Sequence, residues 1–85
     1  MAYPALQLHT TLLSKAISNS VVEVISIETP DSELKNRLLA HGIVPGTKIK
    51  VLKKAPLGCP IIISLLGFSL SLRLSEASVI RVTEI

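Results

Sequence analysis

The sequence predicts a small, mainly β-stranded domain with one short helix, in which five strands form a bent sheet that closes on itself as a small β-barrel. Three observations support this prediction. Short β-branched or alternating segments recur along the chain, one helix is signalled between residues 29 and 42, and the composition is 48% hydrophobic but only 2% aromatic. A chain of 85 residues allows one domain over residues 1–85, with residues 1–11 flexible or loosely packed.

The N-terminal third begins with a weak signal and ends with a clear one. Within Met1 to Ser20, four apolar residues have the spacing of one helical turn: Leu12, Leu13, Ala16 and Ile17. Residues 18–20 are predicted to form a loop. Residues 21–27 are β-branched and form the first predicted strand. Alternation separates its two faces, with Val22, Val24 and Ser26 on one and Val21, Glu23, Ile25 and Ile27 on the other.

A short helix is predicted next, from the residues that favour a helix start. Thr29 precedes a proline and is a candidate N-cap, and Asp31 is the alternative. Leu34, Leu38 and His41 then follow at i, i+4 and i+7, which predicts that this stripe faces the core. The helix is short, so its stability must come from packing on the sheet.

The helix is expected to end at a glycine, and a turn is expected to follow it. Gly42 suits a left-handed C′ position, and Leu38 and Ile43 would then meet in a Schellman ending. Pro45 and Gly46 suit the two central positions of a type II turn. These residues set the angle between the helix and a second strand that starts at Thr47.

The remaining strands follow from alternation and turn residues. Ile49 and Val51 alternate with lysines in the second strand, a loop spans residues 55–60, and residues 61–66 form an apolar third strand. After a tight turn at Gly67, the fourth strand presents Phe68, Leu70, Leu72 and Leu74 on one face. One helical turn capped by Ser75 then leads to a last strand over residues 79–85, in which Ile80 and Val82 share a face.

The composition excludes several classes of function. The stretch from Ala55 to Leu72 lacks charge, but its prolines, glycines and alternation argue against a membrane-spanning helix. The single cysteine and the absence of a signal peptide favour the reducing cytosol. The net charge of +3 is too mild to imply nucleic acid, and the lack of stacking rings disfavours single-stranded nucleic acid. The lysines of the second strand are therefore read as a solvated face, with a contact to an anion as the alternative: Lys48, Lys50, Lys53 and Lys54.

Candidate functional residues are few, and each has a structural alternative. The sequence contains no recognised catalytic motif and no paired-cysteine metal spacing, so we expect no enzyme. His41 and Cys59 are weak candidates for metal ligands, against a packed rim histidine and an ordinary loop thiol. The excess of apolar residues, including Leu57 at a loop tip and Leu65 and Leu66 on one strand, suggests a docking surface unless the helix and the terminal segment cover it.

Three motifs in order resemble the FeoA family, the small cytosolic component of bacterial ferrous iron uptake. They are Leu38 to Gly46, Ala55 to Pro60, and Gly67 followed by Leu72 to Ala77 and Ile80 to Val82, within a match that runs from about Leu12 to the C-terminus. The resemblance implies a Src-homology-3-like barrel with no enzymatic activity and no cofactor. It also implies docking on the cytosolic GTP-binding part of the transporter FeoB, which would give the chain its only link to the membrane.

The resemblance does not specify which surface contacts the partner, and it leaves one alternative function open. We expect partner contacts at Lys53, Lys54, Pro56, Leu57, Gly58 and Cys59, and a homo-oligomer stays open. The alternative is a metal-responsive or metal-binding domain, like those that end iron- and manganese-dependent repressors. The sequence departs from the family pattern at His41, where an aliphatic residue is usual, at Cys59, where aspartate is common, and at residues 18–20, where a glycine is usual.

Overall fold

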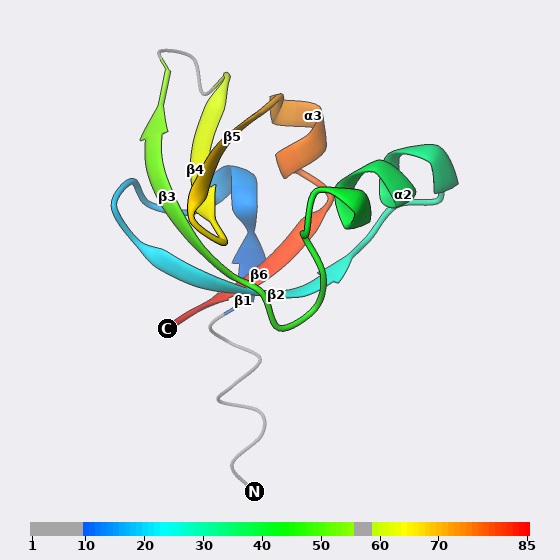
Figure 1. Ribbon diagram of the computed structural model, residues 1–85, viewed down its shortest axis with the longest axis horizontal. Helices are drawn as coiled ribbons and strands as arrows, with labels where there is room; N and C mark the ends of the chain where they lie inside the picture. The colour runs from blue at the N-terminus through cyan, green and yellow to red at the C-terminus, as the bar shows by residue number, and fades with distance from the viewer. Residues whose placement is uncertain (1–9, 56–58) are drawn as a thin grey trace, which may run out of the picture.

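The computed structural model describes residues 10–55 and 59–85, which form one curved sheet with short helices at its margins (Figure 1). The order along the chain is β1 (Thr10–Leu12), the 3-10 helix η1 (Leu13–Lys15), β2 (Val21–Ile27), α2 (Ser32–Ala40), β3 (Lys48–Lys54), β4 (Ile61–Leu65), β5 (Phe68–Leu72), α3 (Leu74–Ala77) and β6 (Ile80–Glu84). Among these residues, no helix is long and apolar enough to cross a membrane.

Over residues 10–55 and 59–85 the sheet has six strands and two open edges, so the prediction of five strands in a closed barrel is wrong in both respects. The strands run antiparallel in the order β1-β6-β2-β3-β4-β5. Sequence analysis missed β1 because three residues are too few to show alternation, and Thr10 and Thr11 pair with β6 instead of being loosely packed. Register shifts in β2 and β3 bend the sheet around the core without joining its edges.

The core lies on the concave side of this bent sheet. Within the described residues, no polar or charged side chain is buried. The buried side chains are apolar and come from strands, helices and turns: Leu13, Ala16, Val22, Val24, Ile27, Leu38, Ile43, Ile49, Val51, Ile61, Ile63, Leu65, Leu72, Ala77, Ile80 and Val82. Ile27 was expected on the face opposite Val22 and Val24, but the register shift between Val24 and Ser26 turns it into the core.

Helix α2 begins at the alternative cap and ends as predicted. The Asp31 carboxylate accepts a hydrogen bond from the Leu34 N–H at 3.1 Å, so Asp31 and not Thr29 is the N-cap. At the other end, the Ile43 N–H donates to the Leu38 carbonyl at 3.1 Å and the Gly42 N–H to Leu39 at 3.0 Å. These are the two bonds of a Schellman ending, and Gly42 has the left-handed φ of +96° that such an ending requires.

The predicted core stripe of α2 stops before His41. Leu38 is fully buried and Leu34 half-buried, but His41 is the C-cap and is exposed, so its predicted core-facing position is wrong. The chain turns away at Gly42 before the stripe completes another turn. The type II turn at Pro45 and Gly46 is confirmed, with a φ of +94° at Gly46 and a 3.0 Å hydrogen bond from the Thr47 N–H to the Val44 carbonyl.

The β4–β5 hairpin and the segment after it differ from prediction in their exposure. Leu66 and Gly67 form a two-residue turn with φ values of +52° and +89°, which matches type I′. Strand β5 ends at Leu72, and Leu74 begins α3, so Ser75 is not a cap. Leu72 is buried, but Phe68 at the start of this edge strand and Leu74 at the start of α3 are exposed, against the expectation that all would face the core.

Candidate functional site

The predicted partner loop joins β3 to β4, and the structure describes its two sides. Lys53 and Cys59 are exposed, as the prediction requires. The Ala55 N–H donates to the Pro60 carbonyl at 3.0 Å, which closes the base of the loop. Pro56, Leu57 and Gly58 lie outside the described residues, so the structure does not test their role.

Lys54 differs from its neighbours because it is tied to another part of the chain. Its Nζ donates to the backbone carbonyl of Ser14 at 3.0 Å, and the residue is half-buried. That bond links the end of β3 to η1. The exposed lysines of this strand, including Lys48 and Lys50, confirm the predicted solvated face, whereas Lys54 also anchors the N-terminal turn.

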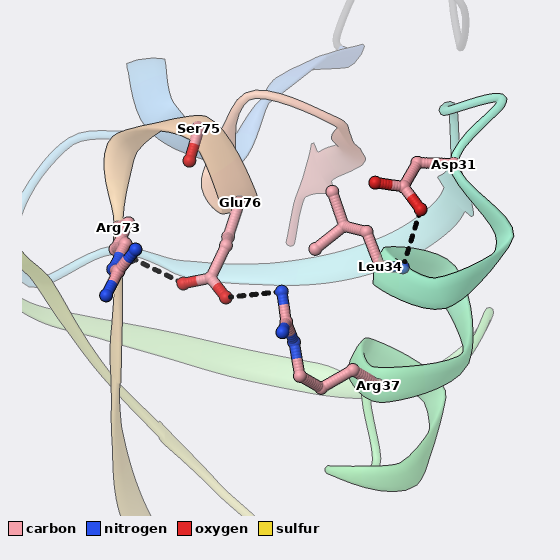
Figure 2. A pocket seen from close by; sticks show the side chains of 6 residues that line it. All are labelled: Asp31, Leu34, Arg37, Arg73, Ser75 and Glu76. Carbon is pink, nitrogen blue, oxygen red and sulfur yellow. Dashed lines mark hydrogen bonds and ion pairs between the residues drawn. The ribbon is translucent and has the colours of Figure 1, made fainter.

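A second candidate surface is an open groove between the α2 and α3 regions, with a volume of about 490 Å³ (Figure 2). Its lining is Asp31, Leu34, Arg37, Arg73, Ser75 and Glu76. The Glu76 carboxylate accepts a hydrogen bond from the Arg73 N–H at 2.8 Å and forms an ion pair with Arg37 at 3.6 Å. The ion pair joins α2 to α3 across the groove, whereas the hydrogen bond lies within α3 and satisfies the backbone N–H of its N-cap residue.

The groove has recognition chemistry but no catalytic arrangement. The Arg37 side chain is 61% exposed, so its ion pair with Glu76 contributes little to stability. The described lining holds no histidine or cysteine, and no hydrogen bond joins Ser75 to a carboxylate, so a nucleophile paired with a base is absent from it. Sequence analysis missed the groove because residues about forty positions apart form it, and only the two helix starts gave a local signal.

An exposed ion pair connects the end of β2 to β6. The Arg81 guanidinium donates to both oxygens of the Glu28 carboxylate, at 3.1 and 3.4 Å for the closest contact to each, and the Ser26 hydroxyl donates to the same group at 3.2 Å. The hydrogen bond from Arg81 lowers the pKa of the Glu28 carboxyl below its ordinary value. This pair links β6 to the end of β2, from which the chain enters the α2 segment.

The comparisons with known proteins decide the family. The family model described as FeoA domain matches residues 11–84. The chain belongs to the FeoA family. This family is implicated in ferrous iron transport, and no curated protein matches the sequence significantly.

Solved structures of FeoA proteins share the fold of this chain. The FeoA-like protein of Clostridium acetobutylicum is 42% identical with a TM-score of 0.81, and the match covers 91% of this chain and 88% of that one. The FeoA of Stenotrophomonas maltophilia, a prokaryotic Src-homology-3 domain protein complexed with zinc, is 25% identical with a TM-score of 0.75 over 85% and 88% of the two chains. The predicted Src-homology-3-like fold is therefore confirmed, although the sheet is open.

A metal-dependent regulator also shares the fold. A manganese-dependent transcriptional repressor bound to manganese has a TM-score of 0.83, at 18% identity over 89% of this chain and 37% of that protein. In this FeoA domain, His41 caps α2 and Cys59 lies in the β3–β4 loop. The residues that the structure describes include no group of three or more histidine, cysteine, aspartate or glutamate residues that could hold a metal ion.

Two of the exposed apolar side chains of this FeoA domain lie at the β4–β5 hairpin. Leu66 is 71% exposed and Phe68 is 52% exposed, whereas Leu65 is buried. The Leu66 side chain lies against Gly42, because a Cβ atom added to Gly42 would stand 3.0 Å from Leu66 Cδ1. One of the apolar residues expected to be in excess of the core, Leu66, is therefore exposed beside the C-terminal end of α2.

Proposed function

We propose that this chain is a non-enzymatic, cytoplasmic accessory protein of ferrous iron uptake that docks on the cytosolic GTP-binding part of a FeoB-type transporter. The observation that supports this most is the FeoA match over residues 11–84, together with 42% identity to a FeoA-like protein along nearly its whole length. The groove between α2 and α3 has polar groups for recognition and no catalytic pairing among its described residues, which fits an accessory role.

We place the main contact at the β3–β4 loop. Lys53 and Cys59 are exposed on its two sides, and the hydrogen bond between Ala55 and Pro60 holds the base of the loop together. Leu57 stands between Pro56 and Gly58 in the sequence and offers an apolar group for burial in the partner. Lys53 would add a charged contact at the rim of that interface.

A binding experiment with the transporter's cytosolic domain tests both parts of the proposal. The wild-type chain should retain that domain in a pull-down, and Leu57→Ala should reduce the amount recovered. Ile25→Ala is the matched control, because Ile25 is an exposed apolar residue on a different strand. Failure of the wild type to retain the domain would reject the docking function, and equal recovery by Leu57→Ala would reject only the assigned role of Leu57.

A second candidate function is direct binding of a transition metal, favoured by the zinc complex of the Stenotrophomonas FeoA. His41 and Cys59 are exposed residues of this chain whose side chains suit zinc or ferrous iron. Titration of Fe(II) or Zn(II) under anaerobic, reducing conditions should show stoichiometric binding that Cys59→Ser or His41→Ala weakens. Absence of binding tighter than about micromolar affinity would exclude this candidate.

A further inference from the structure

Strand β5 forms one edge of the sheet and has backbone groups without a described partner. Among the described residues it pairs only with β4, through a two-residue turn that makes Leu65 and Phe68 a hydrogen-bonded pair. Such pairs alternate along antiparallel strands, so Leu70 and Leu72 also bond to β4 while Ser69 and Ser71 direct their N–H and C=O groups away from it.

The residue after β5 supports this assignment of directions. Arg73 follows Ser69 and Ser71 in the same alternation, and its N–H donates to the Glu76 carboxylate and not to β4. The protein therefore satisfies one outward group with its own side chain. No described residue provides a hydrogen bond to the outward groups of Ser69 and Ser71, and both residues are exposed. Water or another strand must satisfy these groups.

Strand β5 also lacks the features that usually prevent edge-to-edge pairing. Natural edge strands are very short or carry lysine, proline or a bulge. The opposite edge, β1, is only three residues long. Strand β5 has five residues, no charge and no proline, and it pairs with β4 without a register shift. An edge of this kind is suited to receive a strand.

The apolar side chains of the hairpin are available at the same edge. Phe68 is 52% exposed and Leu70 is half-buried, although both lie on the sheet face that carries buried Leu72. Leu66 has a φ of +52°, a conformation that bulky residues rarely adopt and in which asparagine or glycine is favoured, and it is 71% exposed. The hairpin thus exposes apolar side chains to water, one of them on a residue with an unfavourable positive φ, beside an open edge of the sheet.

We propose that a second copy of this chain pairs with β5, antiparallel about a twofold axis at Leu70. In this register the N–H and C=O groups of Ser69 in one copy exchange hydrogen bonds with those of Ser71 in the other, and the twofold axis repeats the same pair on the other side of Leu70. Leu70 then faces its own counterpart, and Phe68 faces Leu72 of the second copy. The alternation of serine and apolar residues in β5 makes the strand self-complementary in this arrangement.

The charges near the interface and its small buried area determine how tightly the two copies would associate. The strand itself is uncharged, and the register places the two Arg73 residues at opposite ends of the interface, roughly 20 Å apart. At that distance, salt screens their repulsion, because the screening length is about 8 Å at physiological ionic strength. A pair of five-residue strands buries less surface than a standard interface, so the dimer should be reversible, with a Kd on the order of 100 μM.

Sedimentation of the intact chain from about 10 μM to 1 mM tests the proposal. The wild type should pass from monomer to dimer over this range. Of the hydrogen-bonding groups of the strand, Ser71→Pro removes only one outward N–H, and it should weaken association at least about tenfold, whereas Ser71→Ala keeps that group and should associate like the wild type. Ser69→Lys, which adds a gatekeeping charge at the edge, should also weaken association if the proline variant does not fold. A wild type that stays monomeric, or a dimer that folded Ser71→Pro and Ser69→Lys leave intact, would overturn the proposal.

Disulfide trapping tests the register. In a Cys59→Ser background, Leu70→Cys should form an intermolecular disulfide readily, because the two Leu70 residues face each other at a Cα distance of about 4.5 Å. Ser71→Cys in the same background should cross-link much less, because its counterpart is displaced by two residues along the strand. Equal cross-linking of the two variants would contradict the pairing, whatever the function of the family.

Discussion

Gly42 provides a quantitative test of how α2 is joined to β3. Its φ is +96°, so any other L-residue there is strained, and Gly42→Ala should cost about 1–2 kcal/mol of unfolding free energy. The added Cβ would stand 3.0 Å from Leu66 Cδ1 and 3.6 Å from Leu65 Cδ1. Leu66 is 71% exposed, so its side chain can move aside at a cost on the order of 0.5 kcal/mol. Gly42→Val adds β-branching and should cost about 2–3 kcal/mol.

Thermal unfolding measures this effect, and the chain offers a matched control. Gly46 has a similar φ of +94°, but a Cβ there would meet nothing within 4 Å. Gly46→Ala should therefore show the backbone strain alone. Each alanine variant should lower the Tm by roughly 4–16 °C for a domain of this size. A Gly42→Ala variant that melts within about 1 °C of the wild type would refute the assignment of Gly42 as the strained C′ residue.

Three further predictions concern a cap, an ion pair and a turn. Asp31→Ala should destabilise the protein by about 1 kcal/mol because the Leu34 N–H loses its acceptor, and Thr29→Ala, which leaves the cap in place, should change the Tm much less. Arg81→Gln should raise the pKa of the Glu28 carboxyl towards its ordinary value, which an NMR titration measures. In the wild type the Arg81–Glu28 pair stabilises the fold near neutral pH. This contribution is lost as the pH falls from about 4, the pKa of the unfolded chain, through the lowered pKa of the folded state. An unchanged Glu28 titration would show that Arg81 is not the cause. Leu66→Asn should raise the unfolding free energy by about 1 kcal/mol because asparagine accepts the positive φ of the turn, and a lower Tm would instead assign Leu66 a packing role.

The parts of the fold that could be predicted from the sequence are those specified by local chemistry. The β-branched run gave β2 with its observed bounds, Val21–Ile27. Gly42, Pro45 and Gly46 gave the helix ending and the turn, because positive φ and fixed φ are properties of single residues. Gly67 marked the hairpin turn for the same reason.

The features that depend on tertiary structure could not be predicted. The short β1 exists because β6 offers it a partner, and nothing local in Thr10–Leu12 indicates a strand. The alternation of β5 predicted a buried face, but its position at the sheet edge leaves Phe68 uncovered. His41 matched the helical stripe by spacing, yet the chain changes direction one residue later and leaves it exposed. Periodicity assigns a face to a residue without showing whether anything covers that face.

The candidate site was predicted only where a motif is contiguous in sequence. The β3–β4 loop is a single segment with turn residues, so its position and the exposure of Lys53 and Cys59 could be anticipated. The groove joins Asp31 and Arg37 on α2 to Arg73 and Glu76 near α3, and no local pattern relates these residues. The open edge of β5 likewise follows from strand order and not from composition.

The most direct test of the account is an NMR titration of the isotope-labelled chain with the cytosolic domain of a FeoB-type transporter. We predict saturable changes that centre on the β3–β4 loop, including the amides of Lys53 and Cys59, with little change at Ile25 on the exposed side of β2. A spectrum unchanged at saturating concentrations of that domain would contradict the proposal that this FeoA protein docks on the transporter.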